Sequence, residues 1–447
     1  MKRLFGHCLI SAAAIVAHVI GGATALAAPV LMVSIDGLRA DDISAADQKD
    51  LQIPTLRTLA AGGLTAAGVK GVLPTITYPS HITMITGVHP SHHGIVSNAT
   101  FDPQGRNMGG WMWYAQDIKV PTLWDSVKAK GGTVASIGWP SSVGASSIDF
   151  HIPEYWRARI AEDEKLLRVV STPGMADEIA HDTGVPFSHV ALDYSDMDSA
   201  RMSWVSAIIA KHKPRLTTLH LVTLDGARHK YGPDSPEAKA TLAQIDKGLK
   251  TMIDKARAAQ PDLVVAIVSD HGFAPVNKSL NLAAALAAEG LIQYGPTGKV
   301  ESWSAYPWTM GGSAAILLND PQDKGLEDRV RRILARLAAD PANGIEKLLG
   351  RAEIAGLGGT SQAAFWVTMK SGYLTMASAD KTLVQTPSYK GTHGYSPDNA
   401  DMRSVFLLSG PGIAQRQVGV IDMRDIAPTI GDILEAQLPQ YDGKIIK

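Results

Sequence analysis

The sequence predicts an α/β protein: a doubly wound, mostly parallel sheet with helices on both faces and a smaller inserted cap. Three nearly continuous apolar runs, at residues 29–35, 217–224 and 262–269, are typical of strands buried on both faces of a parallel sheet. Residues 235–259 between the last two runs alternate polar and apolar, and Pro236 stands in their first turn, as helix starts favour. The order strand, helix, strand favours right-handed crossovers and hence a doubly wound sheet.

The remaining segments divide the chain into a core and an insertion. Residues 277–385 are less regular and rich in turns, so we expect them to form the cap. The core should resume with a strand at residues 404–408 and end in a helix near residues 425–435. The core is therefore predicted at residues 28–276 and 386–447.

The composition excludes some classes of protein. The chain has 447 residues with 42 Lys and Arg against 43 Asp and Glu, which excludes a nucleic-acid protein that works through bulk positive charge. The 45% of hydrophobic residues and 19% of charged residues indicate a globular chain. We expect its partner to be a small molecule.

The N-terminus has the pattern of a secretory signal, predicted at residues 1–27. Lys2 and Arg3 precede an apolar stretch at residues 9–20 and a run of small residues. An uncleaved membrane anchor is the alternative, but this stretch is shorter than the ~20 residues that a span needs, and no other stretch is apolar enough to span. We therefore expect a periplasmic or secreted protein. Cleavage would remove Cys8, the only cysteine, and with it any disulfide or thiolate ligand.

Each of the three predicted strands ends in an aspartate: Asp36, Asp225 and Asp270. Taken singly, each is explained as a helix cap or a turn former. In open α/β sheets, however, ligands bind beyond the carboxyl ends of the strands. Three carboxylates at one sheet edge repel one another unless a cation lies among them.

Histidines accompany these aspartates. His229 follows Asp225 by four residues and converges with it if the segment is helical, and His271 is adjacent to Asp270. His393 lies in a glycine-flanked loop before the predicted strand at residues 404–408. A lone histidine is more often structural, but a mixed set of Asp and His ligands suits zinc.

Thr77 is a candidate nucleophile. Pro79 fits the first position of a helix, which would put Thr77 just before the helix N-terminus, where free amides and partial positive charge gather. A hydroxyl placed there next to zinc can ionise near neutral pH and attack a phosphoryl group. Considered alone, Thr77 is better explained as a helix cap.

These elements share their order with a known family. The stretches that carry the likeness are residues 30–37, 74–81, 86–90, 93–98, 225–233, 269–272, 392–395 and 425–429. Together they resemble the alkaline phosphatase superfamily, and more closely its nucleotide pyrophosphatase/phosphodiesterase (type I phosphodiesterase) family. The resemblance implies an alkaline-phosphatase-like fold and cleavage of phosphodiester or pyrophosphate bonds.

The resemblance also implies roles for individual residues. Two zinc ions per chain are expected, one held by Asp36, Thr77, Asp270 and His271, the other by Asp225, His229 and His393. Thr77 would form a covalent phosphothreonine intermediate. Asn98 would donate a hydrogen bond to a non-bridging phosphoryl oxygen.

The chain departs from the family pattern around the nucleophile. Diesterases of this family commonly carry Phe and Asn where this chain has Tyr78 and Ser80, and often Gly where it has Arg228. These changes leave the metal ligands intact but put the leaving-group pocket in doubt. Tyr78 is interpreted either as a ring that stacks on the substrate or as a core aromatic.

Other functions stay open beside the phosphodiesterase. A phosphomonoesterase with the same threonine would need extra cations for its terminal phosphate, and Arg157 and Arg159 are candidates, although a solvated helix face explains them too. Phosphonoacetate hydrolysis and a degenerate, non-catalytic binding protein are further alternatives. The absence of the sulfatase pattern around Thr77 disfavours that chemistry.

Overall fold

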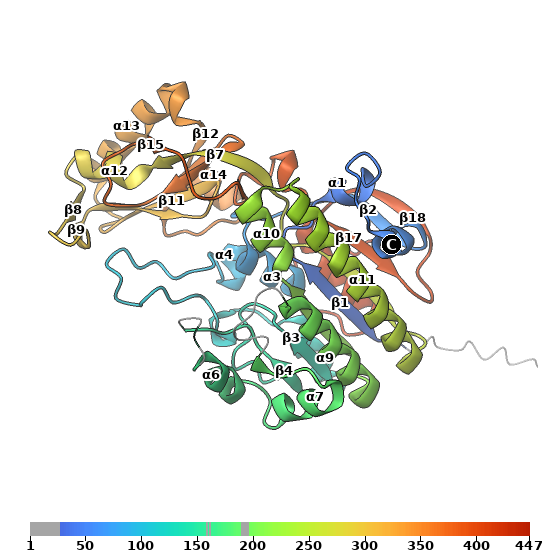
Figure 1. Ribbon diagram of the computed structural model, residues 1–447. Coiled ribbons are helices and arrows are strands. Elements are labelled where there is room, and N and C mark those ends of the chain that lie inside the picture. Colours follow the sequence, from blue (N-terminus) through green and yellow to red (C-terminus); the bar gives the residue numbers. More distant parts are fainter. Residues whose placement is uncertain (1–26, 158–159, 161, 189–195) are drawn as a thin grey trace, which may run out of the picture.

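The computed structural model describes residues 27–157, 160, 162–188 and 196–447, so all of the predicted signal segment except Ala27 lies outside the described residues. The largest element is an eight-stranded sheet (Figure 1). In spatial order its strands are β18 (Arg416–Asp422), β2 (Leu64–Lys70), β17 (Phe406–Ser409), β6 (Val264–Val268), β1 (Val30–Ile35), β5 (Leu216–Leu221), β3 (Val134–Ile137) and β4 (Phe150–Ile152). β17 runs antiparallel to both neighbours and all other pairs are parallel, which confirms the mostly parallel sheet.

Helices cover both faces of this sheet because its strands are apolar on both sides. In β1, Leu31 and Val33 belong to one core, whereas Val30 and Met32 belong to the other. The first core is covered by α2 (Pro54–Ala61), α9 (Met197–His212) and α11 (Pro236–Ala259), of which α9 and α11 lie side by side in Figure 1. The second core is covered by α3 (Thr77–Thr86), α5 (Leu123–Ala129) and α15 (Ile426–Ile433).

The cap forms a separate lobe, drawn in yellow and orange in Figure 1. It has its own apolar core and a four-stranded antiparallel sheet in the order β10 (Ala305–Thr309), β11 (Ser313–Leu318), β13 (Ala363–Met369), β12 (Ile345–Gly350). Helices α12 (Leu282–Ala288) and α13 (Lys324–Ala339) pack on it, and β8 (Ile292–Tyr294) pairs with β9 (Val300–Trp303). The strand β7 (Ala274–Asn281), which begins three residues before the predicted boundary, connects it to β6. The exact domain boundaries remain a prediction.

Two predicted element ends differ from the structure. The strand predicted to end at Leu224 ends at Leu221, because Asp198 accepts hydrogen bonds from the amides of Val222 and Thr223 and a helix, α10 (Thr223–Tyr231), begins there. α3 begins at Thr77 itself, two residues earlier than the position of Pro79 suggested. Among the residues that the structure describes, no helix combines the length and apolarity needed to cross a membrane.

Candidate metal centre and active site

The ends of two neighbouring strands bring Asp36 and Asp270 together. Asp36 follows β1 directly, and its amide donates to the carbonyl of Leu221 on the adjacent strand (2.9 Å). Gly37 then turns the chain with a φ of +72°, a conformation that favours glycine, and its amide donates to Asp270 Oδ1 (3.1 Å). The backbone at the end of β1 therefore holds the Asp270 carboxylate in place.

Six acidic and histidine side chains form two adjoining clusters. In the first, His271 Nε2 lies 3.4 Å from Asp36 Oδ1 and 3.0 Å from Asp270 Oδ2. In the second, Asp225 Oδ1 lies 3.4 Å from His229 Nε2 and 3.6 Å from His393 Nε2. The rings of His271 and His393 stack at 3.5 Å, so the clusters are in contact. All six residues singled out in the sequence thus gather at one edge of the sheet.

Secondary structure explains how the second cluster forms. Asp225 and His229 lie one turn apart in α10, which puts both side chains on one face of that helix. His393 reaches them from the loop after β16 (Gly391–Thr392), where Gly394 has a φ of +85°. A Cβ at Gly394 would lie 1.8 Å from the carbonyl oxygen of Met310 in the cap, so this close approach requires glycine.

The three histidine rings share one orientation. Each Nδ1 lies within hydrogen-bond distance of a backbone carbonyl: Gly391 for His229 (2.9 Å), Gly272 for His271 (3.0 Å) and Thr75 for His393 (3.2 Å). A carbonyl can only accept, so each Nδ1 carries a proton and each ring turns its Nε2 toward the carboxylates. This is the arrangement in which histidine binds a metal.

The pKa shifts and the unpaired buried atoms at these clusters indicate that a positive charge would stabilise the site. Burial, followed by the charges of Asp270 and Asp225, raises the pKa of Asp36 well above its ordinary value. Burial acts in the same direction on Asp270, but His271 outweighs it and holds the pKa of Asp270 well below the ordinary value. Asp36 Oδ1, Asp225 Oδ1, Asp270 Oδ2 and His271 Nε2 are buried without a hydrogen-bond partner. A divalent cation in each cluster would give these atoms a partner, so these residues fit metal ions.

Thr77 lies at the edge of the same site. It is the first residue of α3, where the helix dipole favours a negative charge. The Tyr78 amide donates to Asn98 Oδ1 (2.9 Å), which leaves the Nδ2 group of Asn98 as a donor beside the helix start. A nucleophile and a hydrogen-bond donor therefore accompany the two clusters.

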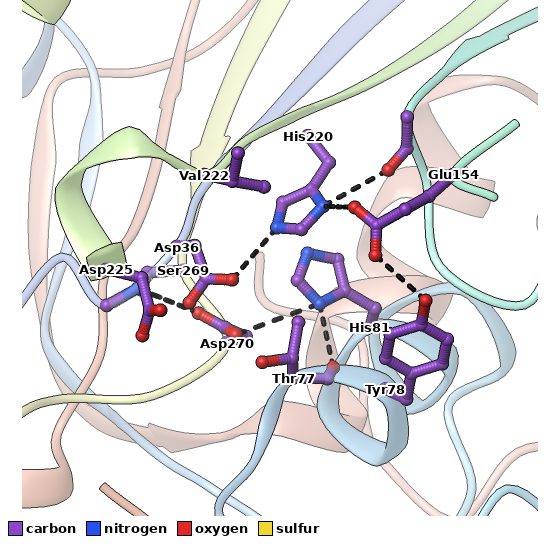
Figure 2. A network of polar contacts seen from close by, with 12 residues as sticks. Asp36, Thr77, Tyr78, His81, Glu154, His220, Val222, Asp225, Ser269 and Asp270 are labelled. Carbon is purple, nitrogen blue, oxygen red and sulfur yellow. Dashed lines mark hydrogen bonds and ion pairs between the residues drawn. The ribbon is translucent and has the colours of Figure 1, made fainter. Parts of the chain in front are cut away.

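A network of buried polar side chains contacts Asp36 on its buried side (Figure 2). The sequence analysis did not predict this network. His220 Nε2 lies 3.1 Å from Asp36 Oδ2, and its Nδ1 lies 3.2 Å from Glu154 Oε2. Glu154 Oε1 in turn accepts from the Tyr78 hydroxyl (2.8 Å). Only the tertiary structure connects these residues. The one sequence signal was a histidine, His220, inside a strand otherwise made of leucine and threonine.

His81 completes this network without carrying charge. Its Nδ1 lies 2.8 Å from the Thr77 carbonyl oxygen, and its ring lies 4.3 Å from that of His220. Burial and the neighbouring His220 lower the pKa of His81 to about 3, so the ring is neutral at physiological pH. Figure 2 shows His81 between Thr77 and His220, where it braces the start of α3.

A cavity of about 570 Å³ opens on Thr77 from the core side, and we call it the core cavity. Trp111 and Trp156 line its wall, and Arg201 and Lys230 are among its cations. Tyr78 is fully buried behind Trp111, whose ring lies 5.2 Å away. Tyr78 therefore fits the interpretation as a core aromatic, and Trp111 is the ring exposed to the site.

Two further arginines that the sequence analysis named, Arg157 and Arg228, are not members of the metal clusters. Arg157 is exposed and its backbone amide donates to Asp163, and it is not among the residues that line the core cavity. Arg159 lies outside the described residues. Arg228 is buried and donates to the Gly37 carbonyl and to Asp42 Oδ2, so it ties α10 to the loop after Asp36.

A mostly parallel α/β sheet that ends in two Asp/His clusters, beside a threonine at a helix N-terminus, defines a candidate metal-dependent hydrolytic centre. The chain belongs to the type I phosphodiesterase / nucleotide pyrophosphatase family, whose model matches residues 30–396. This confirms the family expected from the sequence.

Several curated relatives are similar to the chain over part of their length. It is 26% identical over 260 residues to an uncharacterized pyrophosphatase/phosphodiesterase of Schizosaccharomyces pombe, covering 57% of this chain and 47% of that protein. Human ectonucleotide pyrophosphatase/phosphodiesterase family member 1 is 24% identical over 256 residues, which cover 55% of this chain and 23% of that protein. A venom phosphodiesterase of Naja atra is 22% identical over 405 residues, which cover 87% of this chain and 42% of that protein. The chain thus spans less than half the length of these relatives.

Solved structures share the fold over nearly the whole chain. Human ectonucleotide pyrophosphatase/phosphodiesterase 5 is similar with a TM-score of 0.66 at 21% identity, covering 93% of this chain and 97% of the other. The murine counterpart was solved as an inactive threonine-to-alanine variant in complex with AMP. It is similar with a TM-score of 0.65 at 19% identity, covering 93% of this chain and 97% of the other. The predicted fold class is therefore confirmed.

Replacing Asp36 should separate metal binding from stability. Asp36→Asn is expected to abolish metal binding at the first cluster and to raise the melting temperature of the metal-free protein by a few degrees at pH 7. The raised pKa means that the fold disfavours the ionised carboxylate, which a neutral amide avoids. This gain should shrink as the pH falls, because the wild-type carboxylate then becomes protonated.

Thermal scans of the chelated protein measure the change in melting temperature, with the exposed Asp41→Asn as control. A lower melting temperature for the metal-free variant would contradict this account.

Replacing His220 should weaken the metal site without touching a metal ligand. His220→Phe leaves Asp36 Oδ2 and Glu154 without their shared partner, so we expect metal affinity to fall about 10- to 100-fold. Metal titration of the purified variant measures this. The control is His151→Phe, which removes a buried histidine of β4 that contacts Ser142 (2.9 Å). Equal metal affinities of His220→Phe and His151→Phe would show that His220 does not support the metal site.

Proposed function

We propose that this chain is an exported two-zinc hydrolase that cleaves phosphodiester or pyrophosphate bonds through a phosphothreonine intermediate. One observation carries the proposal. Three histidine rings turn their Nε2 atoms toward carboxylate oxygens that have no hydrogen-bond partner, directly beside Thr77 at the start of α3. Membership of the type I phosphodiesterase / nucleotide pyrophosphatase family supports the same chemistry. Export is proposed from the signal pattern at residues 1–27.

The donor sets suggest which residues would hold each ion. Asp36, Asp270, His271 and Thr77 would bind one zinc, and Asp225, His229 and His393 the other. Oxygen and imidazole ligands without sulfur are common at catalytic zinc sites. Bound zinc would lower the pKa of the Thr77 hydroxyl and neutralise charge on the leaving oxygen.

The residues of the chain then divide the reaction between them. Thr77 Oγ gives its proton to solvent and forms a bond to phosphorus while the bond from phosphorus to the leaving oxygen breaks, and the departing oxygen takes up a proton from water. Water next attacks the phosphothreonine, releases the phosphorylated product and restores the hydroxyl. Asn98 Nδ2 donates to a non-bridging oxygen, and the dipole of α3 adds partial positive charge at its start.

Loss of the nucleophile is the direct test. Thr77→Ala should lower hydrolysis of bis(4-nitrophenyl) phosphate at least about 1,000-fold, because no other group forms the covalent intermediate. Release of nitrophenolate measures the rate. Thr86→Ala is the matched control, since Thr86 lies in the same helix but its hydroxyl donates to the Ile82 carbonyl. A Thr77→Ala protein that keeps its fold, its metal and full activity would show that the nucleophile is wrongly assigned.

Metal content and substrate preference give an independent test. We expect two zinc ions per purified chain by elemental analysis. Chelation should abolish hydrolysis and lower the melting temperature, because the carboxylates of the two clusters then repel one another. The diester should be preferred to 4-nitrophenyl phosphate. If the monoester is cleaved faster, the protein is a phosphomonoesterase, and if neither is cleaved, phosphonoacetate is the next substrate to try.

A further inference from the structure

A second cavity, which we call the cap cavity, opens on the metal clusters from the side of the cap. Its volume is about 520 Å³. From the core it is lined by Asn98, His229 and His393, and from the cap by residues 306–311, 374, 375 and 377 among others. It therefore joins the candidate active site to the part of the chain for which the sequence predicted no role.

The wall of the cap cavity is aromatic. Phe101, from the loop after α4 (Pro90–His93), has its ring 6.2 Å from that of Tyr306 and 5.5 Å from that of Trp308. All three line the cavity. Trp303 packs on Phe101 at 5.4 Å from outside it. In Figure 1 this loop runs toward the β8–β9 end of the cap, in agreement with these contacts. Such a wall suits an aromatic or apolar group.

The charge of the cap cavity excludes another kind of ligand. Among the described residues that line it there is no lysine or arginine. Its carboxylate, Asp102, accepts hydrogen bonds from the amides of Arg106 (2.8 Å) and Asn107 (2.5 Å) and adds no positive charge. A departing pyrophosphate carries several negative charges and requires cations for its binding. The core cavity, by contrast, contains Arg201 and Lys230.

The direction of the reaction decides which part of the substrate enters the cap cavity. In phosphoryl transfer the leaving oxygen lies opposite the attacking oxygen. Thr77 lines the core cavity but not the cap cavity, which is lined by Asn98 and by His393 of the second cluster, and the two cavities meet at His229. Resting on the function proposed above, we propose that the cap cavity binds the leaving group and selects an uncharged, aromatic alcohol, so that the enzyme cleaves phosphodiesters in preference to pyrophosphates.

Two substrates with the same retained group test this directly. Thymidine 5′-monophosphate 4-nitrophenyl ester and thymidine triphosphate both leave a thymidylyl group on Thr77, but their leaving groups are nitrophenol and pyrophosphate. We expect kcat/KM for the ester to be at least about 100-fold higher. Tyr306→Ala should lower kcat/KM for the ester about 10-fold and leave that for the triphosphate unchanged, whereas Tyr306→Phe, which keeps the ring, should act as wild type.

Further variants separate this role from structural damage. Trp303→Ala removes a ring of the same aromatic group outside the cavity and should not change the ratio of the two kcat/KM values. Thr309→Arg introduces a cation into the cavity and should shift that ratio toward the triphosphate about 10-fold or more. Because ratios are compared between variants, the intrinsic reactivity of each leaving group cancels.

Two outcomes would overturn the proposal in distinguishable ways. If Thr77-dependent cleavage occurs but Tyr306→Ala and Thr309→Arg leave the ratio unchanged, the cap cavity does not bind the leaving group and the proposed function stands. If the wild type cleaves neither substrate nor bis(4-nitrophenyl) phosphate, the proposed function fails and this inference fails with it.

Discussion

Repulsion among three aspartates at one edge of the sheet is the constraint on which the rest of the site depends. Asp36, Asp225 and Asp270 each keep one buried oxygen without a hydrogen-bond partner. In a packed interior such an arrangement is costly unless a cation lies among the oxygens. The sheet, the helix α10 and the loop at His393 bring these groups together in spite of that cost, and the large apolar cores on both faces of the sheet offset it.

The surrounding residues serve to keep these ligands in a single geometry. His220 and Glu154 support Asp36 from the buried side, and Arg228 connects α10 to the loop that follows Asp36. The guanidinium of Arg228 turns away from the site toward Asp42, whose pKa it helps to hold well below the ordinary value although burial raises it. Arg228 therefore belongs to the framework of the metal centre. In our proposal, the contacts that distinguish one leaving group from another lie in the cap cavity.

Much of the core and of the site was predictable from the sequence because the signals were local. Unbroken apolar runs indicated β1 and β6, and the aspartates beyond them were found directly. The turn at Asp225 was harder, because its helix begins early through an acceptor on α9, Asp198, that no local pattern reveals. His220 and Trp111 were missed for a similar reason, since their roles depend on partners in other elements.

By itself the sequence determined the parallel α/β core, the family and the set of groups that gather at the end of the sheet, because strand periodicity, turns and motif order depend on neighbouring residues. Only the tertiary structure decided how those groups face one another. The contact of His220 with Asp36 spans 184 positions and that of His393 with Thr75 spans 318, and such pairs form only when whole elements pack. The same packing buried Tyr78, left Trp111 in the wall of the core cavity and enclosed a cap cavity whose described lining carries no lysine or arginine.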